Sequence, residues 1–337
     1  MKKIFIWLMK AFVSGLVALG IATGFCFFYY NFPSVYVNET GATDYVVDAN
    51  HISIRGTEGF AYTKTDEYGF VNTFPDKKDS IDVLVMGSSH TQGLNVDADE
   101  NFTYVLNKKL KENGYDKFAY SIGSSGHNLI VCLRNLENAI KVYQPEEYVV
   151  VEASAIDFDV NVWEQLNNGT HEKLTAYDSG VMLYLKKFDF VRLAISQVYN
   201  FVFKDSQESV TTEEQTETSE KYLEKNRQLV ETAIRNASTI AEKNNCKLVI
   251  IYSPQIEVDY YGDIVKEAPS FGYEIFRDAC EKYNVEFVDM FDTYEKMYEE
   301  SNRLPNGFSN SAIGKGHINK YGHNCIGSKL YDTIVEE

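Results

Sequence analysis

Three glycine-containing loops carry the residues that could do chemistry. The first, residues 87–93, reads GSSHTQG and offers Ser89 as a nucleophile. The second, residues 121–128, reads SIGSSGHN, and its glycines let backbone N–H groups approach a developing oxyanion. The third, residues 314–323, reads GKGHINKYGH and offers His317 as a base for a serine hydroxyl. Together the loops predict nucleophilic catalysis by an activated serine.

Other uses of the first loop are excluded by its residues. A P-loop requires lysine after its last glycine, but Leu94 follows Gly93. An α/β-hydrolase turn requires glycine at position 91, which is Thr91. A lone serine in such a loop can simply cap the next helix, so Ser89 gains its catalytic reading only from the other two loops. His90 adjoins Ser89, but adjacent residues on a turn generally point apart.

The loops follow elements that alternate along the chain. Apolar runs at VLVM, KFAYSIG, EYVVVEAS, CKLVIIYS and VEFVDM have the length of buried strands. Helical patterns separate them, at 99–114, 128–143 and 221–245. This alternation predicts an α/β three-layer sandwich with a roughly five-stranded parallel, flavodoxin-like sheet. Because ligands of open α/β sheets bind at the carboxyl ends of the strands, the loops lie at the expected site.

The remaining chain divides around that domain, which we place at residues 79–337. Residues 32–78 are turn-rich, with short alternating pieces that predict antiparallel strands in a lead-in. An insertion at about 158–220 contains an apolar helical segment, expected to pack on the domain or rest near a membrane surface. It ends in an acidic, threonine-rich stretch, 204–221, which is typical of a solvated loop.

The first 31 residues predict a membrane anchor. An apolar run from Ala11 to Tyr30 has the roughly 20 residues of a spanning helix, and lysines precede or punctuate it at positions 2, 3 and 10. No further lysine or arginine occurs before Arg55, so the positive-inside rule places the N-terminus in the cytoplasm and the domain outside. A cleaved signal peptide is the alternative, but the run exceeds the usual length and shows no convincing cleavage site.

Charge and cysteine content restrict the partners. The net charge of −17 argues against a nucleic-acid partner, because phosphates would be repelled. The five cysteines have no paired spacing, so neither a disulfide framework nor a zinc site is implied. Cys132 and Cys246 lie in apolar or helical surroundings and are expected to be buried thiols.

The order of the three loops resembles that of the SGNH (GDSL-like) hydrolase superfamily, especially its membrane-anchored members linked to bacterial surface polysaccharides. The resemblance extends from about Asp66 to the C-terminus and includes DEYGF before the first loop. It implies that Ser89 is the nucleophile, that His317 is the general base, and that the N–H groups of Ser89 and Gly126 hold the oxyanion. It implies no metal and no organic cofactor.

Three positions depart from the family pattern. Ser88 stands where an aspartate usually precedes the nucleophile. Ile156 aligns with the asparagine of the third block, so Ser154 replaces that oxyanion donor or the donor is missing. Gly314 occupies the position of the acid, three residues before His317. Glu152, at the end of a strand, is a possible orienting acid; like Asp157 and Asp289, it could equally be bound by backbone donors.

The resemblance implies an outward-facing serine esterase or O-acyltransferase. Its substrates would be acyl esters, acetyl esters foremost, of a cell-surface or exported polysaccharide, and the acyl acceptor would be water or a sugar hydroxyl. The alternative is a catalytically inactive polysaccharide-binding or assembly protein with the same fold. The missing asparagine and aspartate favour this alternative, whereas Ser89 and His317 oppose it.

Overall fold

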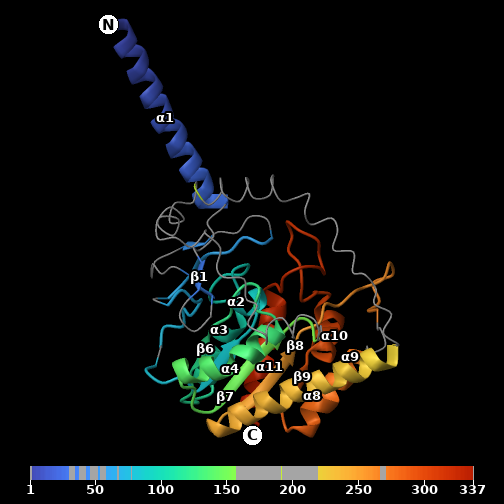
Figure 1. Cartoon of the computed structure of the whole chain (residues 1–337). Coiled ribbons are helices and arrows are strands. Elements are labelled where there is room, and N and C mark those ends of the chain that lie inside the picture. Colours follow the sequence, from blue (N-terminus) through green and yellow to red (C-terminus); the bar gives the residue numbers. More distant parts are fainter. Residues whose placement is uncertain are drawn as a thin grey trace.

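A parallel sheet of five strands forms the centre of the molecule, which is described here from a computed structural model (Figure 1). The structure describes residues 2–29, 35–37, 43–45, 52–53, 58–66, 68–76, 78–156, 191, 219–265 and 271–336. The strand order is β6-β5-β7-β8-β9 and all neighbours are parallel. The strands are β5 (Val83–Met86), β6 (Ala119–Ser121), β7 (Tyr148–Ala153), β8 (Lys247–Tyr252) and β9 (Glu286–Asp289). The predicted α/β fold with a five-stranded parallel sheet is confirmed.

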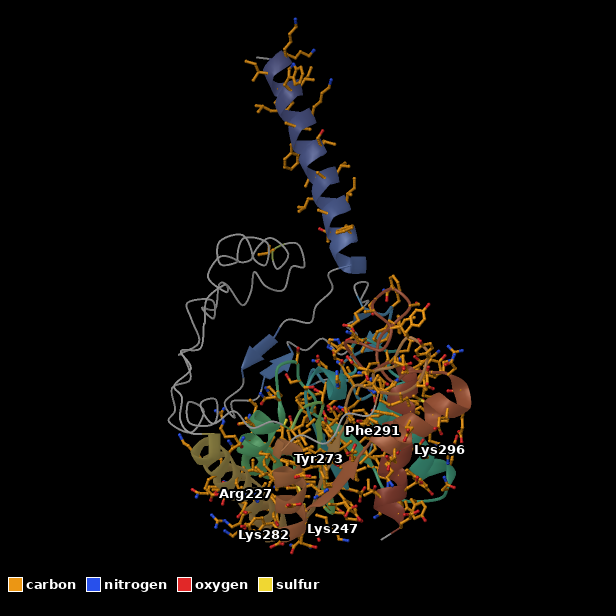
Figure 2. All side chains as sticks on the ribbon, turned by 90° about the vertical axis from the view of Figure 1, so that its right-hand side faces the viewer. Arg227, Lys247, Tyr273, Lys282, Phe291 and Lys296 are labelled. Carbon is orange, nitrogen blue, oxygen red and sulfur yellow. The ribbon has the colours of Figure 1, made fainter. Side chains whose placement is uncertain are left out.

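Helices cover both faces of this sheet and complete the three layers (Figure 1). One face packs against α3 (Phe102–Glu112), α10 (Phe291–Ser301) and α11 (Lys320–Val335). The other packs against α4 (Leu129–Tyr143), α8 (Ser219–Lys243) and α9 (Phe271–Lys282). Charged side chains such as Lys247, Lys282 and Lys296 lie on the outside of the body (Figure 2).

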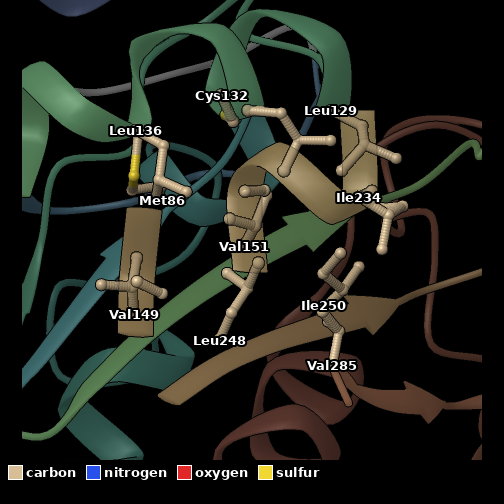
Figure 3. Close-up of a cluster of buried hydrophobic side chains, with 14 of the residues drawn as sticks. Met86, Leu129, Cys132, Leu136, Val149, Val151, Ile234, Leu248, Ile250 and Val285 are labelled. Carbon is tan, nitrogen blue, oxygen red and sulfur yellow. The ribbon is translucent and has the colours of Figure 1, made fainter. Parts of the chain in front are cut away.

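Strand residues alternate between the two hydrophobic cores. Val149 and Val151 of β7 join the core under α4 and α8, where they lie near Leu136 (Figure 3). Tyr148 and Val150 of the same strand join the core under α3 and α11. All residues of β5 and β7 are buried, as expected for strands covered on both faces.

Asparagine side chains mark the starts of three helices. Asn101 accepts the N–H of Tyr104 at the start of α3, and Asn128 does the same for Val131 at the start of α4. Asn319 caps α11. An N-cap oxygen satisfies a backbone donor that lacks an intrahelical partner, and it therefore sets where the helix begins. The caps of α4 and α11, Asn128 and Asn319, belong to the second and third loops.

Part of the expected lead-in packs against the sheet domain. Two short antiparallel pairs lie in this segment, β1 (Val35–Val37) with β2 (Thr43–Tyr45) and β3 (Ile52–Ser53) with β4 (Thr63–Lys64). Phe70 is buried in the core under α4, and the carboxylate of Asp66 accepts the hydroxyl of Tyr120 on β6 at 2.6 Å. The 58–76 stretch therefore shares the hydrophobic core of the domain.

Helix α1 (Lys2–Tyr29) precedes all of this. Its segment Lys2–Phe25 is long and apolar enough to cross a membrane, a test that an N-terminal signal sequence also passes. The predicted 158–220 insertion falls almost entirely outside the described residues. The helix expected at 221–245 is α8, which begins at Ser219 and ends at Lys243.

Candidate active site

Ser89 is the first residue of a four-residue helix, α2 (Ser89–Gln92), which is separated from the end of β5 by two residues. Ser88 is its N-cap, and Gly93 ends it in the left-handed conformation. The turn requires glycine at position 87, because a Cβ there would lie 1.9 Å from Oγ1 of Thr91. The short helix thus presents Ser89 at the carboxyl edge of the sheet.

His317 reaches Ser89 from the loop before α11. Its Nε2 lies 2.9 Å from Oγ of Ser89, across 228 residues of sequence. The loop is held in place by a backbone hydrogen bond from Gly307 N–H to the His317 carbonyl at 2.9 Å, and by a bridge between Asn306 and Ile318. The side chain of His317 is 30% exposed, so the ring is accessible from the solvent.

A carboxylate that the sequence did not predict, that of Glu58, lies on the other side of the His317 ring and completes a row of three side chains with His317 and Ser89. One oxygen of Glu58, Oε2, lies 2.6 Å from Nδ1 of His317, and Oε1 accepts the backbone N–H of the same residue at 2.6 Å. Asn95 donates to the Glu58 carbonyl at 2.8 Å, and the neighbouring Gly59 N–H donates to Asn310 at 2.8 Å. These contacts fix both the carboxylate and the ring that it binds.

Glu152, the acid suggested from the sequence, does not contact His317. Its side chain is wholly buried, and its carboxylate accepts the hydroxyls of Thr91 at 3.0 Å and of Ser253. The reason is the alternation of β7, which turns Glu152 into the core under α10 and α11. Asp289 accepts from Tyr273 and Phe291, and Asp157 lies outside the described residues.

Glu58 carried no usable sequence signal. It lies 259 residues before His317, in a turn-rich segment that we assigned to the lead-in, and no family spacing points to it. Gly314, where the acid was expected, has a left-handed φ of 82° and donates to the Asn306 carbonyl. The structure shows how closely the loop approaches Glu58 at Gly316, where a Cβ would lie 2.1 Å from Oε1 of Glu58.

The expected oxyanion donors surround the same turn. The loop of Gly126 is bound to the nucleophile turn through Ser124 N–H, which donates to the Gly87 carbonyl at 3.0 Å. Gly126 has a φ of 86° and open space at its Cβ position. Within the described chain, neither the N–H of Ser89 nor that of Gly126 donates to a protein acceptor. Ser154 is exposed immediately after β7.

Three further histidines lie close by. The ring of His90 is 5.5 Å from that of His317. His323 is buried, accepts the Phe102 N–H, and has its pKa lowered to about 3 by burial and by the nearby His90 and His317. His127 lines a cavity of about 30 Å³ with Gly87; burial, then Arg134, lowers its pKa.

One cysteine lies near this arrangement, because Cys132 lines the same cavity as Gly87 and His127. Cys132 and Cys246 are buried free thiols, as predicted, and burial raises the pKa of each. Among the described residues, no group of three or more His, Cys, Asp or Glu side chains could hold a metal ion.

Comparisons with known proteins give structural matches only. No family model matches the chain, and no curated protein does. Solved structures of SGNH and GDSL-like esterases and acylhydrolases do match it. The psychrotrophic esterase EstA from Pseudoalteromonas sp. is 15% identical with a TM-score of 0.39, over 75% of this chain and 96% of that one.

Two further matches are similar in extent. A putative SGNH hydrolase from Slackia heliotrinireducens is 11% identical with a TM-score of 0.39, over 76% of this chain and 100% of that one. A two-domain esterase active on acetylated mannans is 14% identical with a TM-score of 0.41, over 77% of this chain and 50% of that one. Identities and TM-scores this low do not carry an activity over, so the geometry around Ser89 is the evidence for function.

Proposed function

We propose that the chain is a serine ester hydrolase or O-acyltransferase of SGNH type. The observation that carries the proposal is the continuous row of contacts from Glu58 through His317 to Ser89. A carboxylate, an imidazole and a serine hydroxyl in hydrogen-bond contact form the arrangement that activates a serine in unrelated hydrolase folds. The roles predicted for Ser89 and His317 remain proposals on this geometry.

Each group has a defined role in the proposed reaction. As Oγ of Ser89 attacks the ester carbonyl, its proton passes to Nε2 of His317, and the carbonyl electrons move to the oxygen. The intermediate collapses by breaking the bond to the alcohol, which leaves with the proton from His317. Water or a sugar hydroxyl then attacks the acyl group on Ser89, and its proton returns through His317 to Oγ.

Glu58 would keep His317 ready for both steps. An ionised carboxylate accepts only, so its contact with Nδ1 places the ring proton there and leaves the lone pair of Nε2 facing Ser89. Its second oxygen accepts the backbone N–H of His317, so Glu58 holds both the backbone and the ring of this residue. Glu58 thus takes the role of the acid that the family pattern places at position 314, where this chain has glycine.

The developing oxyanion would be held by backbone donors. The N–H groups of Ser89 and Gly126 are without protein acceptors in the described chain, and Ser89 lies in the first turn of α2, where backbone N–H groups have no intrahelical acceptor. The hydroxyl of Ser154, exposed at the end of β7, is the third proposed donor. This assignment supplies the contact that the missing asparagine would otherwise make.

The proposed substrates are acyl esters, acetyl esters foremost, of a cell-surface or exported polysaccharide. The motif resemblance to membrane-anchored members of the superfamily supports this substrate class. The lysines before and within α1 support a cytoplasmic N-terminus and an extracytoplasmic domain. The rival, an inactive polysaccharide-binding protein, is weakened because Glu58 supplies an acid after all.

A fluorophosphonate probe and a chromogenic acetyl ester test the proposal. The purified chain is expected to bind the probe covalently and to hydrolyse the ester. Ser89→Ala should abolish both, whereas Ser88→Ala, its neighbour in the same turn, should keep the labelling. Labelling that survives Ser89→Ala but disappears in Ser88→Ala would show that Ser88, and not Ser89, is the nucleophile. An unlabelled parent chain would favour the non-catalytic alternative.

A further inference from the structure

A second imidazole and carboxylate lie beneath the proposed catalytic row. His90 follows Ser89 on α2, and its ring meets that of His317 edge to face, at 72° with 5.5 Å between centroids. Nδ1 of His90 is buried without a hydrogen bond inside the described chain, and Oε1 of Glu152 lies 3.5 Å from it. Small rearrangements would turn this approach into a hydrogen bond.

Glu152 connects three elements of the site. It ends β7, wholly buried, and accepts one hydroxyl from Thr91 on α2 and one from Ser253, which directly follows β8. Thr91 is two residues from Ser89 on the same short helix. The carboxylate therefore holds the nucleophile helix against the carboxyl ends of two central strands.

The surroundings leave His90 as the basic group for this buried carboxylate. No lysine or arginine in the described residues pairs with Glu152, and a buried charge without a partner is costly. Tyr294 of α10 and His323 of α11 face the same region. The Tyr294 hydroxyl is buried with no partner among the described groups, and Nδ1 of His323 already accepts the Phe102 N–H.

We propose that Glu152 and His90 are positioning residues for the reaction assigned to Ser89 and His317. Glu152 fixes the turn that carries Ser89 and orients the His90 ring, and that ring restrains the plane of the His317 imidazole. Glu58 binds one corner of that imidazole, and the contact with His90 limits its remaining rotation. The inference rests on the proposed serine chemistry, because it assigns no separate reaction to the pair.

Kinetics of single and double variants of the full chain, purified in detergent, test this role. Glu152→Gln keeps one acceptor oxygen for the hydroxyl of Thr91 or of Ser253, replaces the other oxygen with an amide NH₂, and loses the charge that pairs with His90. His90→Phe keeps a ring against His317 but loses Nδ1. Because small misplacements of reacting groups are costly, each should lower kcat by about 10-fold to 100-fold, with KM within about twofold of the parent. The loss of kcat in the double variant should be no greater than the larger of the two losses in the single variants.

Asp82→Asn is the matched control. Asp82 is also a buried carboxylate, but it lies at the amino end of the sheet, just before β5, and accepts the Phe118 N–H at 2.6 Å. It should lower the melting temperature without changing kcat. If Glu152→Gln folds poorly, His90→Phe alone still decides, since it touches neither hydroxyl bound by Glu152.

The outcomes separate this inference from the proposed function. An active parent whose Glu152→Gln and His90→Phe variants keep kcat within twofold overturns the positioning role and leaves the serine chemistry intact. Fully additive losses in the double variant overturn it as well, because they mean that the two residues act independently. A parent that neither binds the fluorophosphonate nor hydrolyses the ester overturns both proposals.

Discussion

His317 has a different partner at each ring nitrogen, and this asymmetry defines its proposed work. Glu58 lies at Nδ1 and Ser89 at Nε2, so the ring can hold a proton on one side while accepting one on the other. Hydrogen bonds from Asn95 and to Asn310 hold the Glu58 segment in place. The geometry of a single ring thus depends on three distant parts of the chain.

Replacing Glu58 tests this dependence. Glu58→Gln preserves size, but an amide can present its NH₂ group to Nδ1 and stabilise the wrong tautomer. We expect kcat for acetyl-ester hydrolysis to fall by up to about 10⁴-fold, the loss seen when a serine protease triad carboxylate is made an amide. Glu257→Gln is the control, since Glu257 pairs with exposed Lys315 at 4.0 Å. More than a tenth of the parent kcat in Glu58→Gln would remove Glu58 from the mechanism.

His323 gives stability a pH dependence of defined sign. Burial lowers its pKa to about 3, whereas an unfolded histidine titrates near 6.5. Between these values the unfolded chain binds a proton that the folded chain does not bind. The contribution of His323 to the free energy of unfolding is therefore fully present above about pH 6.5 and decreases as the pH falls toward 3. The loss between pH 7 and pH 5 is about 2 kcal/mol for this group.

Denaturant unfolding at both pH values measures that loss. His323→Asn keeps an acceptor for the Phe102 N–H and removes the titrating ring, so its stability should change less between pH 7 and pH 5 than that of the parent. An unchanged difference would mean that other groups, rather than His323, control acid stability.

At the scale of elements, short turns between strands and helices create the site. The α2 turn, the loop of Gly126 and the loop before α11 all lie at the carboxyl edge of the sheet, and backbone hydrogen bonds tie the first two together. The loop before α11 also contains a position where only glycine fits. Gly316 has a φ of 85° and leaves no room for a Cβ beside the Glu58 carboxylate.

Alanine variants of two glycines distinguish the effect of backbone strain from the effect of a Cβ that pushes on Glu58. Gly316→Ala and Gly114→Ala both place alanine at positive φ, which costs about 1–2 kcal/mol. Only the first pushes on Glu58, because the Cβ position of Gly114 has nothing within 4 Å. Both variants should have lower melting temperatures, but only Gly316→Ala should lose kcat, by at least about tenfold. Equal kcat values would show that Glu58 can move aside freely.

At the scale of the whole molecule, the proposed site extends beyond the sheet domain as we delimited it from the sequence. Glu58 and Phe70 precede residue 79, yet the first contacts His317 and the second is buried in the core. We therefore expect a fragment of residues 79–337 to be inactive and poorly folded, and a fragment of residues 31–337 to hydrolyse acetyl esters. Circular dichroism and ester hydrolysis compare them; an active shorter fragment would make the earlier segment dispensable.

The proposed membrane orientation has its own test. With lysines at positions 2, 3 and 10 on the cytoplasmic side, residues after 31 should be degraded when protease is added to intact cells. A cytoplasmic marker protein should stay intact in the same sample. Protection of the domain until the cells are lysed would reverse the topology and remove the support for a surface polysaccharide substrate.

Local patterns in the sequence determined the elements and the loops between them. Apolar runs such as VLVM and EYVVVEAS predicted the strands because burial on both faces demands continuous apolar side chains. Since parallel strands place their carboxyl ends at one edge, the order of Ser89, Gly126 and His317 could be read as one site. The helical patterns predicted starts at about residues 99 and 128, within a few residues of the asparagine-capped starts of α3 and α4.

Only the tertiary structure decided which carboxylate binds His317. Glu58 and Glu152 are both acidic residues far from His317 in sequence, and neither has a spacing that predicts contact. The alternation of β7 buries Glu152 beside His90 and Thr91, while contacts with Asn95 and Asn310 bring Glu58 to the ring. Such contacts depend on how loops separated by more than 200 residues pack, and no local pattern of side chains encodes that packing.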